Sequence, residues 1–531
     1  MSAALSALLD GYLSFRGHLD PVEVTAQGGR RHEFDGALAR YDRESVREQL
    51  AALRGYTVSL EETEADSLDD EIDRTAALHA ARHDILMLER ERPFARDPGF
   101  HLAHALNGLF LLLVRENADH VARARALLSR LRELPEFLEI AAGELTRPAA
   151  VFVEGAREML ATARTILEEA FDDPALDLTA IEPDALEDAR TRASDALAQF
   201  GDALALLDER ATHPFALGRD VFDRKLHTAH MIQDSADELA RFGERLRADA
   251  HAELERVAEE LSPGSHWRDM AARLRADTVP ASELTGEYAE ALDSARTFTG
   301  GRELMSVPGH DPRVVTTPEL LSGLVPVVRY VEPGQGEDER ALLLLATPER
   351  AEGAAHARAE LYSAAAHEGV PGRHQQAMLW RRLARPVRRV LWTPAAREGW
   401  AFYAETLLGA EGFLRTPAAR FFHALRALRR ALWVVLDVSL HTKGMPVERA
   451  EQILREDGGV EASEARADVR RCCSMPTYLL CAAVGRREIV SLREDARRAA
   501  GAGFSLSTFH DALLRYGALP TALARWGMGL A

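Results

Sequence analysis

Apolar residues in the first 300 positions recur at the three- and four-residue spacing of helices that bury one face. The clearest case is residues 184–207, whose apolar positions are Leu186, Ala189, Ala193, Leu197, Phe200, Leu204 and Leu207. This spacing predicts a long amphipathic helix of about six turns that packs in a bundle. Breaks that contain proline, such as RPFARDPGF and ELPEF, separate further helical segments. The pattern therefore predicts helix after helix from about residue 38 to about residue 295.

The pattern changes near residue 301, where proline and glycine become frequent and two short apolar runs follow. The runs VPVVRYV at 325–331 and RALLLLAT at 340–347 predict two strands joined by the turn-rich loop EPGQGEDE. A helix is predicted over 349–368, and the chain is again mostly helical from about residue 394. We therefore expect a mainly α fold, a large multi-helix structure with a cleft and one small β element near residues 325–347.

The same change divides the chain into a helical N-terminal part, residues 1–300, and a C-terminal part, residues 301–531. A Gly/Ser-rich linker is absent from the sequence between them. We expect the two parts to form one integrated unit, with the cleft between them.

Composition supports a globular helical protein and excludes some partners. The 531 residues are 47% hydrophobic and 28% charged, and helix-forming Ala, Leu, Arg and Glu are abundant. The net charge of −19 argues against a nucleic-acid partner, because phosphate binding requires a basic surface. No run of about 18 apolar residues occurs, so neither a membrane span nor a membrane partner is expected.

Cysteine usage and the N-terminal residues bear on location. The three cysteines, Cys472, Cys473 and Cys481, are too few to form a disulfide framework and indicate a reducing compartment. The segment MSAALSALLDGYLSFRGHLDP lacks the basic region and the apolar core of a signal peptide. These features predict a cytoplasmic protein, and they indicate no oligomeric state.

The stretch AAAHEGVPGRHQQ, residues 364–376, contains the candidate chemistry. His367 and Glu368 begin like the zinc motif H-E-x-x-H, in which a helix presents two histidines and a general base. The second histidine of that motif would fall on Pro371, and the next histidine is His374. On an unbroken helix His374 would lie about 10 Å from His367, too far to share an ion. Because Pro371 and Gly372 interrupt the helix, a bent chain could bring a later histidine back.

A carboxylate could complete such a site, since catalytic zinc usually has three protein ligands and one open position. Glu398 and Glu405 are seven residues apart on one predicted helix, so both face the same way. The spacing leaves open which of the two would bind the metal.

Four ordered motifs extend over about 230 residues. Besides HEGVPGRHQQ they are EGWAFYAE at 398–405, a D-x-x-x-H-x-x-G pattern and a closing FHD…G-x-L-P pattern. The residues of the last two patterns are Asp437, His441, Gly444, Phe509, His510, Asp511, Gly517, Leu519 and Pro520. In these motifs the chain resembles the bacterial family called domain of unknown function 885. Members of that family are described as gluzincin-type zinc metallopeptidases with a mostly helical fold and an H-E-x-x-P-G-H motif.

The chain departs from the family pattern at two places. The family's second motif histidine falls on Arg373, so of the zinc ligands that the resemblance implies only His367 and Glu398 carry over. We expect His374, one residue later, to substitute. In the segment DVRRCCSMPTYLLCAAVG, residues 468–485, the two family tyrosines fall on Cys472 and Ala482 and the glutamine falls on Tyr478. Tyr478, a phenolic donor, could replace them, or it could be a core residue.

The first hypothesis is a metal-dependent hydrolase of amide bonds in peptides. Zn²⁺ would be bound by His367, His374 and Glu398, and Glu368 would be the general base. Donors to the oxyanion would come from His441, Tyr478 or His510. Substrate contacts are assigned to Arg373, Arg471 and Tyr403, and the strand in RALLLLAT could offer its edge to an extended peptide.

Two alternatives stay open. The altered segments could mark a hydrolase that acts on a small amide or ester of a specialised pathway. Alternatively, Arg373 could have replaced a ligand because the metal was lost. The protein would then be a metal-free pseudoenzyme that binds a peptide or an acidic ligand, anchored by Arg373 and Arg471.

Overall fold

The computed structural model describes most of the chain. The described residues are 2–27, 32–114, 120–169, 171, 178–179, 181–208, 211–318, 321, 324–325, 327–333, 340–347 and 356–530. The mainly α fold predicted from the sequence is confirmed.

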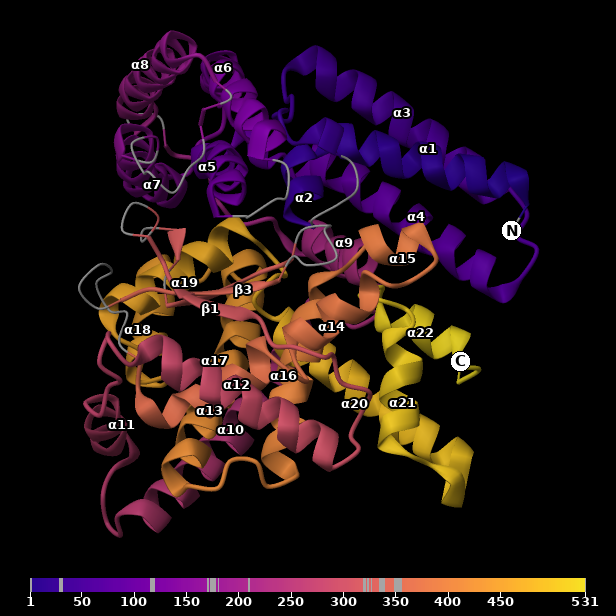
Figure 1. The fold of residues 1–531 in the computed structure, drawn as a ribbon, viewed down its shortest axis with the longest axis vertical. Coiled ribbons are helices and arrows are strands. Elements are labelled where there is room, and N and C mark those ends of the chain that lie inside the picture. Colours follow the sequence, from indigo (N-terminus) through magenta and orange to yellow (C-terminus); the bar gives the residue numbers. More distant parts are fainter. Residues whose placement is uncertain are drawn as a thin grey trace.

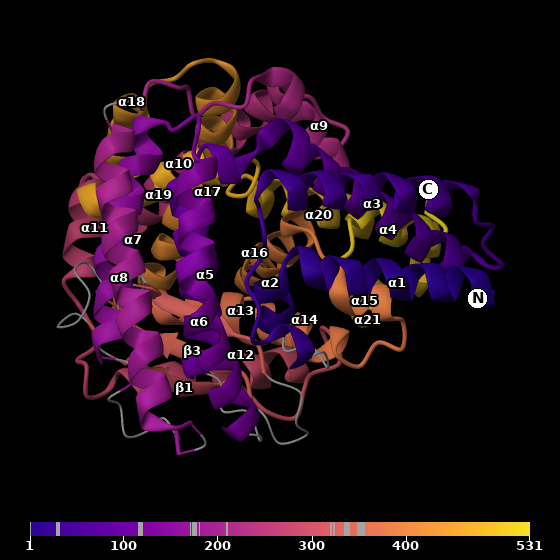
Figure 2. The same ribbon diagram turned by 90° about the horizontal axis from the view of Figure 1, so that it is seen from above.

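The first eight helices form two groups at one end of the molecule (Figures 1 and 2). One group contains α1 (Ala3–Leu19), α2 (Pro21–Ala26), α3 (Arg43–Glu62) and α4 (Leu68–Leu86). The other contains α5 (Pro98–Val114), α6 (His120–Glu144), α7 (Ala150–Glu169) and α8 (Pro183–Asp208). A short 3-10 turn, η1 (His32–Phe34), lies between α2 and α3. The π-helical η2 (Met87–Glu91) and the 3-10 turn η3 (Pro93–Ala95) connect α4 to α5. Helix α8 matches the helix predicted at 184–207, and its apolar stripe packs in the core of the second group.

The next four helices pack with the C-terminal part. They are α9 (Arg219–His230), α10 (Ala236–Leu261), α11 (Trp267–Arg275) and α12 (Leu284–Gly301). Helix α10 lies along α17 (Pro417–Thr442) (Figure 1), and a Cβ at Gly243 would lie 3.0 Å from Cγ1 of Val434. Helices on the two sides of residue 300 therefore share one core. The division of the chain at residue 300 stays a prediction.

The β element is a three-stranded sheet. Its strands are β1 (Arg313–Thr316), β2 (Val328–Val331) and β3 (Leu342–Leu345), in the order β1-β3-β2. Strand β3 pairs in parallel with β1 and antiparallel with β2. The strand predicted to offer a free edge is therefore central, and that prediction is corrected. Its leucines are buried on both faces, against α5–α8 and against α12 and α13, which explains the uninterrupted apolar run.

The remaining elements surround the His-Glu motif. They are η6 (Arg358–Glu360), α13 (Leu361–Glu368), α14 (Arg373–Trp380), α15 (Pro386–Val390), α16 (Pro394–Ala410), α17, α18 (Val447–Glu456), α19 (Ala462–Ser474), α20 (Cys481–Ala500), η7 (Gly501–Gly503), α21 (Leu506–Leu514) and α22 (Thr521–Gly527). The helix predicted over 349–368 starts later than expected, at Leu361, and residues 348–355 lie outside the described residues. Among the described helices, none is both long enough and apolar enough to cross a bilayer.

Candidate functional site

The His-Glu motif lies where α13 ends and the chain turns into α14. Trp400 of α16 fixes this turn, because its indole N–H donates to the carbonyl oxygens of Pro371 at 2.9 Å and Gly372 at 3.2 Å. A Cβ at Gly372 would lie 2.0 Å from the carbonyl oxygen of His367, so a side chain cannot be accommodated at this position. The turn therefore brings the first residue of α14, Arg373, back beside the end of α13.

Arg373 lies between two carboxylates. Its Nε atom is 3.2 Å from Oε2 of Glu368, and its Nη2 atom contacts Oε2 of Glu398. The other oxygen of Glu398, Oε1, accepts a hydrogen bond of 3.0 Å from the hydroxyl of Tyr478. The side chains of Arg373, Glu368 and Glu398 are 19%, 16% and 11% exposed, so a ligand from solvent could reach them. One guanidinium thus contacts both the predicted general base and a predicted metal ligand.

The charge of Arg373 determines the ionisation of Glu398. Burial alone would raise the pKa of Glu398, but the neighbouring Arg373 guanidinium lowers it to about 2. The same pairing raises the pKa of Arg373, although burial opposes it. Both groups are therefore charged at neutral pH, and the pair is stable without a metal ion.

His367 is oriented from behind by Glu405. Its Nδ1 atom lies 3.2 Å from Oε2 of Glu405, and its Nε2 atom lies 3.9 Å from Oε1 of Glu368. Arg430 also lies 3.2 Å from Nδ1, and a guanidinium can only donate, so in this hydrogen bond Nδ1 accepts. Burial lowers the pKa of His367, so the ring is neutral at pH 7. The Glu405 contact favours a proton on Nδ1 and the Arg430 hydrogen bond favours one on Nε2, the nitrogen that faces Glu368.

Glu405 is fully buried and holds several basic groups together. It accepts from Arg430 at 2.9 Å, and it lies 3.2 Å from both Arg426 and His423. Burial would raise the pKa of Glu405, but Arg426 and Arg430 hold it well below the usual range. Burial lowers the pKa of Arg430 to about 10, against the opposing effect of Glu405.

His374 does not join this group, contrary to the prediction. Its Nδ1 atom lies 3.0 Å from the hydroxyl of Tyr330 on β2, and its Nε2 atom lies 2.9 Å from the carbonyl oxygen of His310. Consecutive helical residues point about 100° apart, so with α14 starting at residue 373 the side chain that faces Glu398 is Arg373. Both nitrogens of His374 are occupied elsewhere.

The described residues therefore do not fit the predicted zinc site. Among all the described residues, no group of three or more His, Cys, Asp or Glu side chains is arranged to hold a metal ion. His367 and Glu398 are present, but the Glu398 carboxylate is paired with the Arg373 guanidinium, with which a cation would have to compete. Zinc binding by this chain stays a prediction.

Three other predicted residues make buried polar contacts. His441 is buried on α17, where Nε2 donates to the carbonyl oxygen of Cys472 at 2.8 Å and Nδ1 accepts from the backbone N–H of Leu217. His510 donates from Nδ1 to the carbonyl oxygen of Leu304 and accepts at Nε2 from the hydroxyl of Tyr403, both at 2.8 Å. The polar atoms of His441, His510 and Tyr403 are thus engaged in buried contacts, and the oxyanion and substrate roles of these residues stay predictions.

Of the two remaining predictions, one residue lies at the site and one does not. Tyr478 contacts Glu398 directly. Arg471 is exposed near the end of α19 and is paired with none of the site residues that the structure describes.

Sequence reasoning missed the arginines behind the site. Arg397 forms an ion pair of 2.5 Å with Glu332, and its guanidinium lies over the rings of Trp380 and Trp392. Arg430 could have been found, because it is four residues before Val434 on the buried face of α17. A charged residue on a fully buried helical face is rarely there without a partner.

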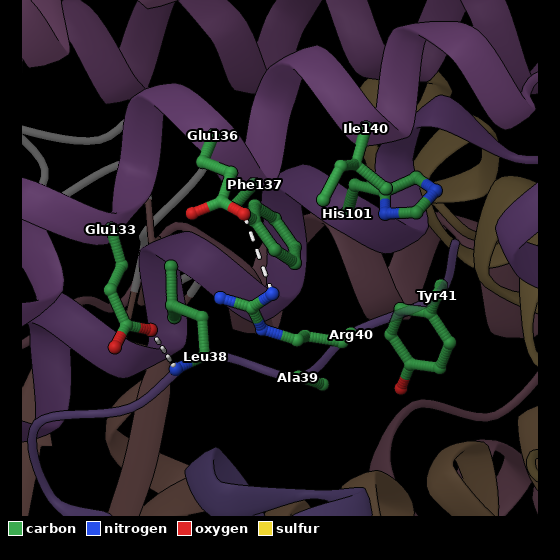
Figure 3. Close-up of a pocket in the computed structure, with 9 residues that line it drawn as sticks. All are labelled: Leu38, Ala39, Arg40, Tyr41, His101, Glu133, Glu136, Phe137 and Ile140. Carbon is green, nitrogen blue, oxygen red and sulfur yellow. Dashed lines mark hydrogen bonds and ion pairs between the residues drawn. The ribbon is translucent and has the colours of Figure 1, made fainter. Parts of the chain in front are cut away.

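Two cavities lie away from the motif. The one in Figure 3 is lined by residues of α5, of α6 and of the segment before α3, among them His101, Glu136 and Arg40, and has a volume of about 20 Å³. This volume is about that of one water molecule. A groove of about 410 Å³ lies between α11 and α18. Neither cavity includes a residue of the His-Glu motif.

Comparison with known proteins assigns a family and a fold. The model of a family described as "Bacterial protein of unknown function (DUF885)" matches residues 21–528. A candidate lipoprotein of unknown function from Shewanella oneidensis has 19% identity, covers 99% of this chain and 100% of its own, and has a TM-score of 0.78. A candidate lipoprotein from Colwellia psychrerythraea has 16% identity, covers both chains fully, and has a TM-score of 0.85. No curated protein matches the chain. At these identities the two structures establish the fold alone.

The descriptions of the two structures contradict the predicted cytoplasmic location. Both proteins are described as lipoproteins. The prediction of a cytoplasmic location rested on cysteine usage and on the first residues of the sequence. The descriptions of the two structures contradict that prediction.

Proposed function

This chain belongs to the bacterial family of unknown function DUF885, and from that premise we propose that it binds a peptide-like ligand without a metal ion. The observation that carries the proposal is the position of Arg373 between Glu368 and Glu398. In the motif that the chain resembles, a histidine occupies this position.

Electrostatics favours the metal-free state. A divalent ion at Glu398 would have to displace a guanidinium that is already paired with two carboxylates, and the two cations would repel each other. The low pKa of Glu398 reflects how strongly Arg373 stabilises its charge. The arginine therefore supplies from within the chain the positive charge that a metal would supply.

The groups around Arg373 suit an amide-containing ligand. Glu368, Arg373, Glu398 and Tyr478 offer partly exposed donors and acceptors, namely two carboxylates, one guanidinium and one phenol. Such a surface can hydrogen-bond both the N–H and the C=O groups of a peptide. Strand β2 lies beside α14 through the Tyr330–His374 contact, and within the described residues only β3 pairs with it. An extended peptide could pair with the second edge of β2 as an added strand.

The proposal is tested by metal analysis and peptide binding on one preparation. The purified protein is saturated with zinc, passed through gel filtration, and analysed for bound metal. We expect well below one equivalent, together with binding of members of a mixed tetrapeptide library that Arg373→Ala weakens. One equivalent of zinc that is lost in Glu398→Ala would overturn the proposal.

Hydrolysis of an amide bond is a second candidate, favoured by the His367–Glu405 contact of 3.2 Å. A second carboxylate that fixes the tautomer of a histidine is typical of metal-ligating histidines. Turnover of peptides or N-acyl amino acids that disappears in Glu368→Gln would support this candidate. Binding without turnover in both proteins supports the first.

A further inference from the structure

The side chain of Arg486, on α20, lies outside the group formed by Glu368, Arg373, Glu398 and Tyr478. Its guanidinium lies 5.4 Å from the centroid of the Phe402 ring, and its Nε atom is buried without a hydrogen-bond partner. Among the described residues no carboxylate or carbonyl group accepts a hydrogen bond from it. Arg486 is half-buried, and a buried guanidinium N–H normally has such a partner, because leaving it unpaired is costly.

Arg486 is connected to the proposed binding site through one aromatic ring. Phe402 lies on α16 between Glu398 and Glu405, and the guanidinium of Arg430 lies 4.2 Å from its centroid. Arg430 in turn contacts His367 and Glu405. The unpaired cation is therefore one side chain away from the His367 group.

Arg486 and Arg493 lie on the same face of α20, and within the described residues Glu494 is the one carboxylate paired with either of them. Arg493 lies seven residues later on the same face of α20, with Nη1 3.3 Å from the hydroxyl of Tyr403 and Nη2 3.3 Å from Glu494. The nearby guanidiniums are those of Arg426, Arg430, Arg486 and Arg493, and the carboxylates that pair with them are those of Glu360, Glu405 and Glu494. Burial lowers the pKa of Arg486, and the charge of Arg493 lowers it further. An added anion would relieve this repulsion.

We infer that Arg486, assisted by Arg493, binds a carboxylate of the ligand. A guanidinium presents a planar fork of N–H donors that matches the two oxygens of a carboxylate. The free C-terminal carboxylate of a short peptide has this chemistry. The inference rests on the proposed binding function and specifies the end of the peptide that is held.

The test uses a matched pair of probes and the full-length protein. N-acetyl-trialanine and its C-terminal amide differ only in the carboxylate, and their affinities are measured by calorimetry at low and high salt. We expect the acid to bind wild-type protein about ten- to hundred-fold more tightly than the amide, as for a hydrogen-bonded charge pair. We expect Arg486→Gln to remove this difference and Arg486→Lys to keep part of it.

Arg498→Gln is the matched control, because Arg498 is an exposed residue of the same helix that pairs with Asp495. It should leave the acid–amide difference unchanged, and thermal unfolding verifies that each variant is folded. Equal affinity of acid and amide for wild-type protein, including no binding of either, overturns the inference. So does a difference that persists in Arg486→Gln. Zinc found in the wild-type protein would overturn the proposed metal-independent function and leave the acid–amide difference intact.

Discussion

Oε2 of Glu405 lies 3.2 Å from Nδ1 of His367, on the opposite side of the ring from Glu368. Glu398, two helical turns earlier on α16, contacts Arg373 instead. The two carboxylates face the same way, as their seven-residue spacing predicted, but they serve different residues. Glu405 contacts the histidine, and Glu398 pairs with Arg373.

Glu405→Gln should destabilise the protein strongly. The substitution leaves Arg430 and His367 buried without the carboxylate that compensates them, and breaking a buried ion pair from one side costs about 3–5 kcal/mol. Urea unfolding measures the loss. Glu253→Gln, which removes an exposed pair with Arg256, should change stability by less than about 1 kcal/mol. Equal effects of the two substitutions would contradict the role given to Glu405.

Arg373→His should create a metal site. Removal of the guanidinium frees Glu398 and Glu368, and a histidine at position 373 would stand beside His367, whose Nε2 atom faces Glu368. We expect about one equivalent of bound zinc, since three protein ligands are then available. Arg373→Ala frees the carboxylates without adding a ligand, and should retain much less zinc after gel filtration. A folded Arg373→His protein that binds no more zinc than wild type would contradict the account of this site.

The sequence was most informative where a local pattern determines the structure. Helix α8 was predictable because its apolar stripe recurs over many turns, whereas β1 is four residues long and lies in a segment rich in proline and glycine. The presence of Arg373 close after the His-Glu pair was visible in the sequence. The orientation of His374 was not, because it depends on the residue at which α14 starts. The unpaired state of Arg486 depends on contacts between α16 and α20, which no local pattern encodes.

Gly485→Ala should prevent α20 from packing on α16. A Cβ at Gly485 would lie 1.8 Å from the carbonyl oxygen of Ala395 and 2.8 Å from Cα of Gly399, so the helices would have to separate. Overpacking of this kind costs about 1–3 kcal/mol, and more where backbone must move. The separation would also displace Glu398 from Tyr478, so peptide binding should fall with stability.

Gly286→Ala is the control for this packing argument. Gly286 is a helical glycine of α12, and a Cβ at this position would meet no atom of the described residues within 4 Å. Alanine should therefore stabilise the protein by up to about 1 kcal/mol. Thermal unfolding of the two variants should shift in opposite directions. A Gly485→Ala protein as stable as wild type would show that the helices do not meet as described.

Asp437 should make the protein less stable as the pH rises. Its side chain is buried on α17, Oδ1 accepts from the backbone N–H of Thr477 at 3.2 Å, and Oδ2 has no partner within the described part of the chain. Burial raises the pKa of Asp437 from 3.8 to about 7. Between these values the folded state binds more protons than the unfolded state, so stability falls with rising pH and the loss is complete above about pH 7.

Asp437→Asn isolates this effect, because asparagine resembles the protonated carboxyl and does not ionise. Compared with wild type, the variant should have similar stability near pH 4. It should gain roughly 2–4 kcal/mol relative to wild type by pH 8. Urea unfolding at several pH values gives the difference, and other groups that titrate in both proteins cancel. Asp188→Asn, at an exposed position paired with Arg192, should show no such pH dependence. A wild-type–variant difference that is constant from pH 4 to pH 8 would mean that Asp437 is ionised throughout.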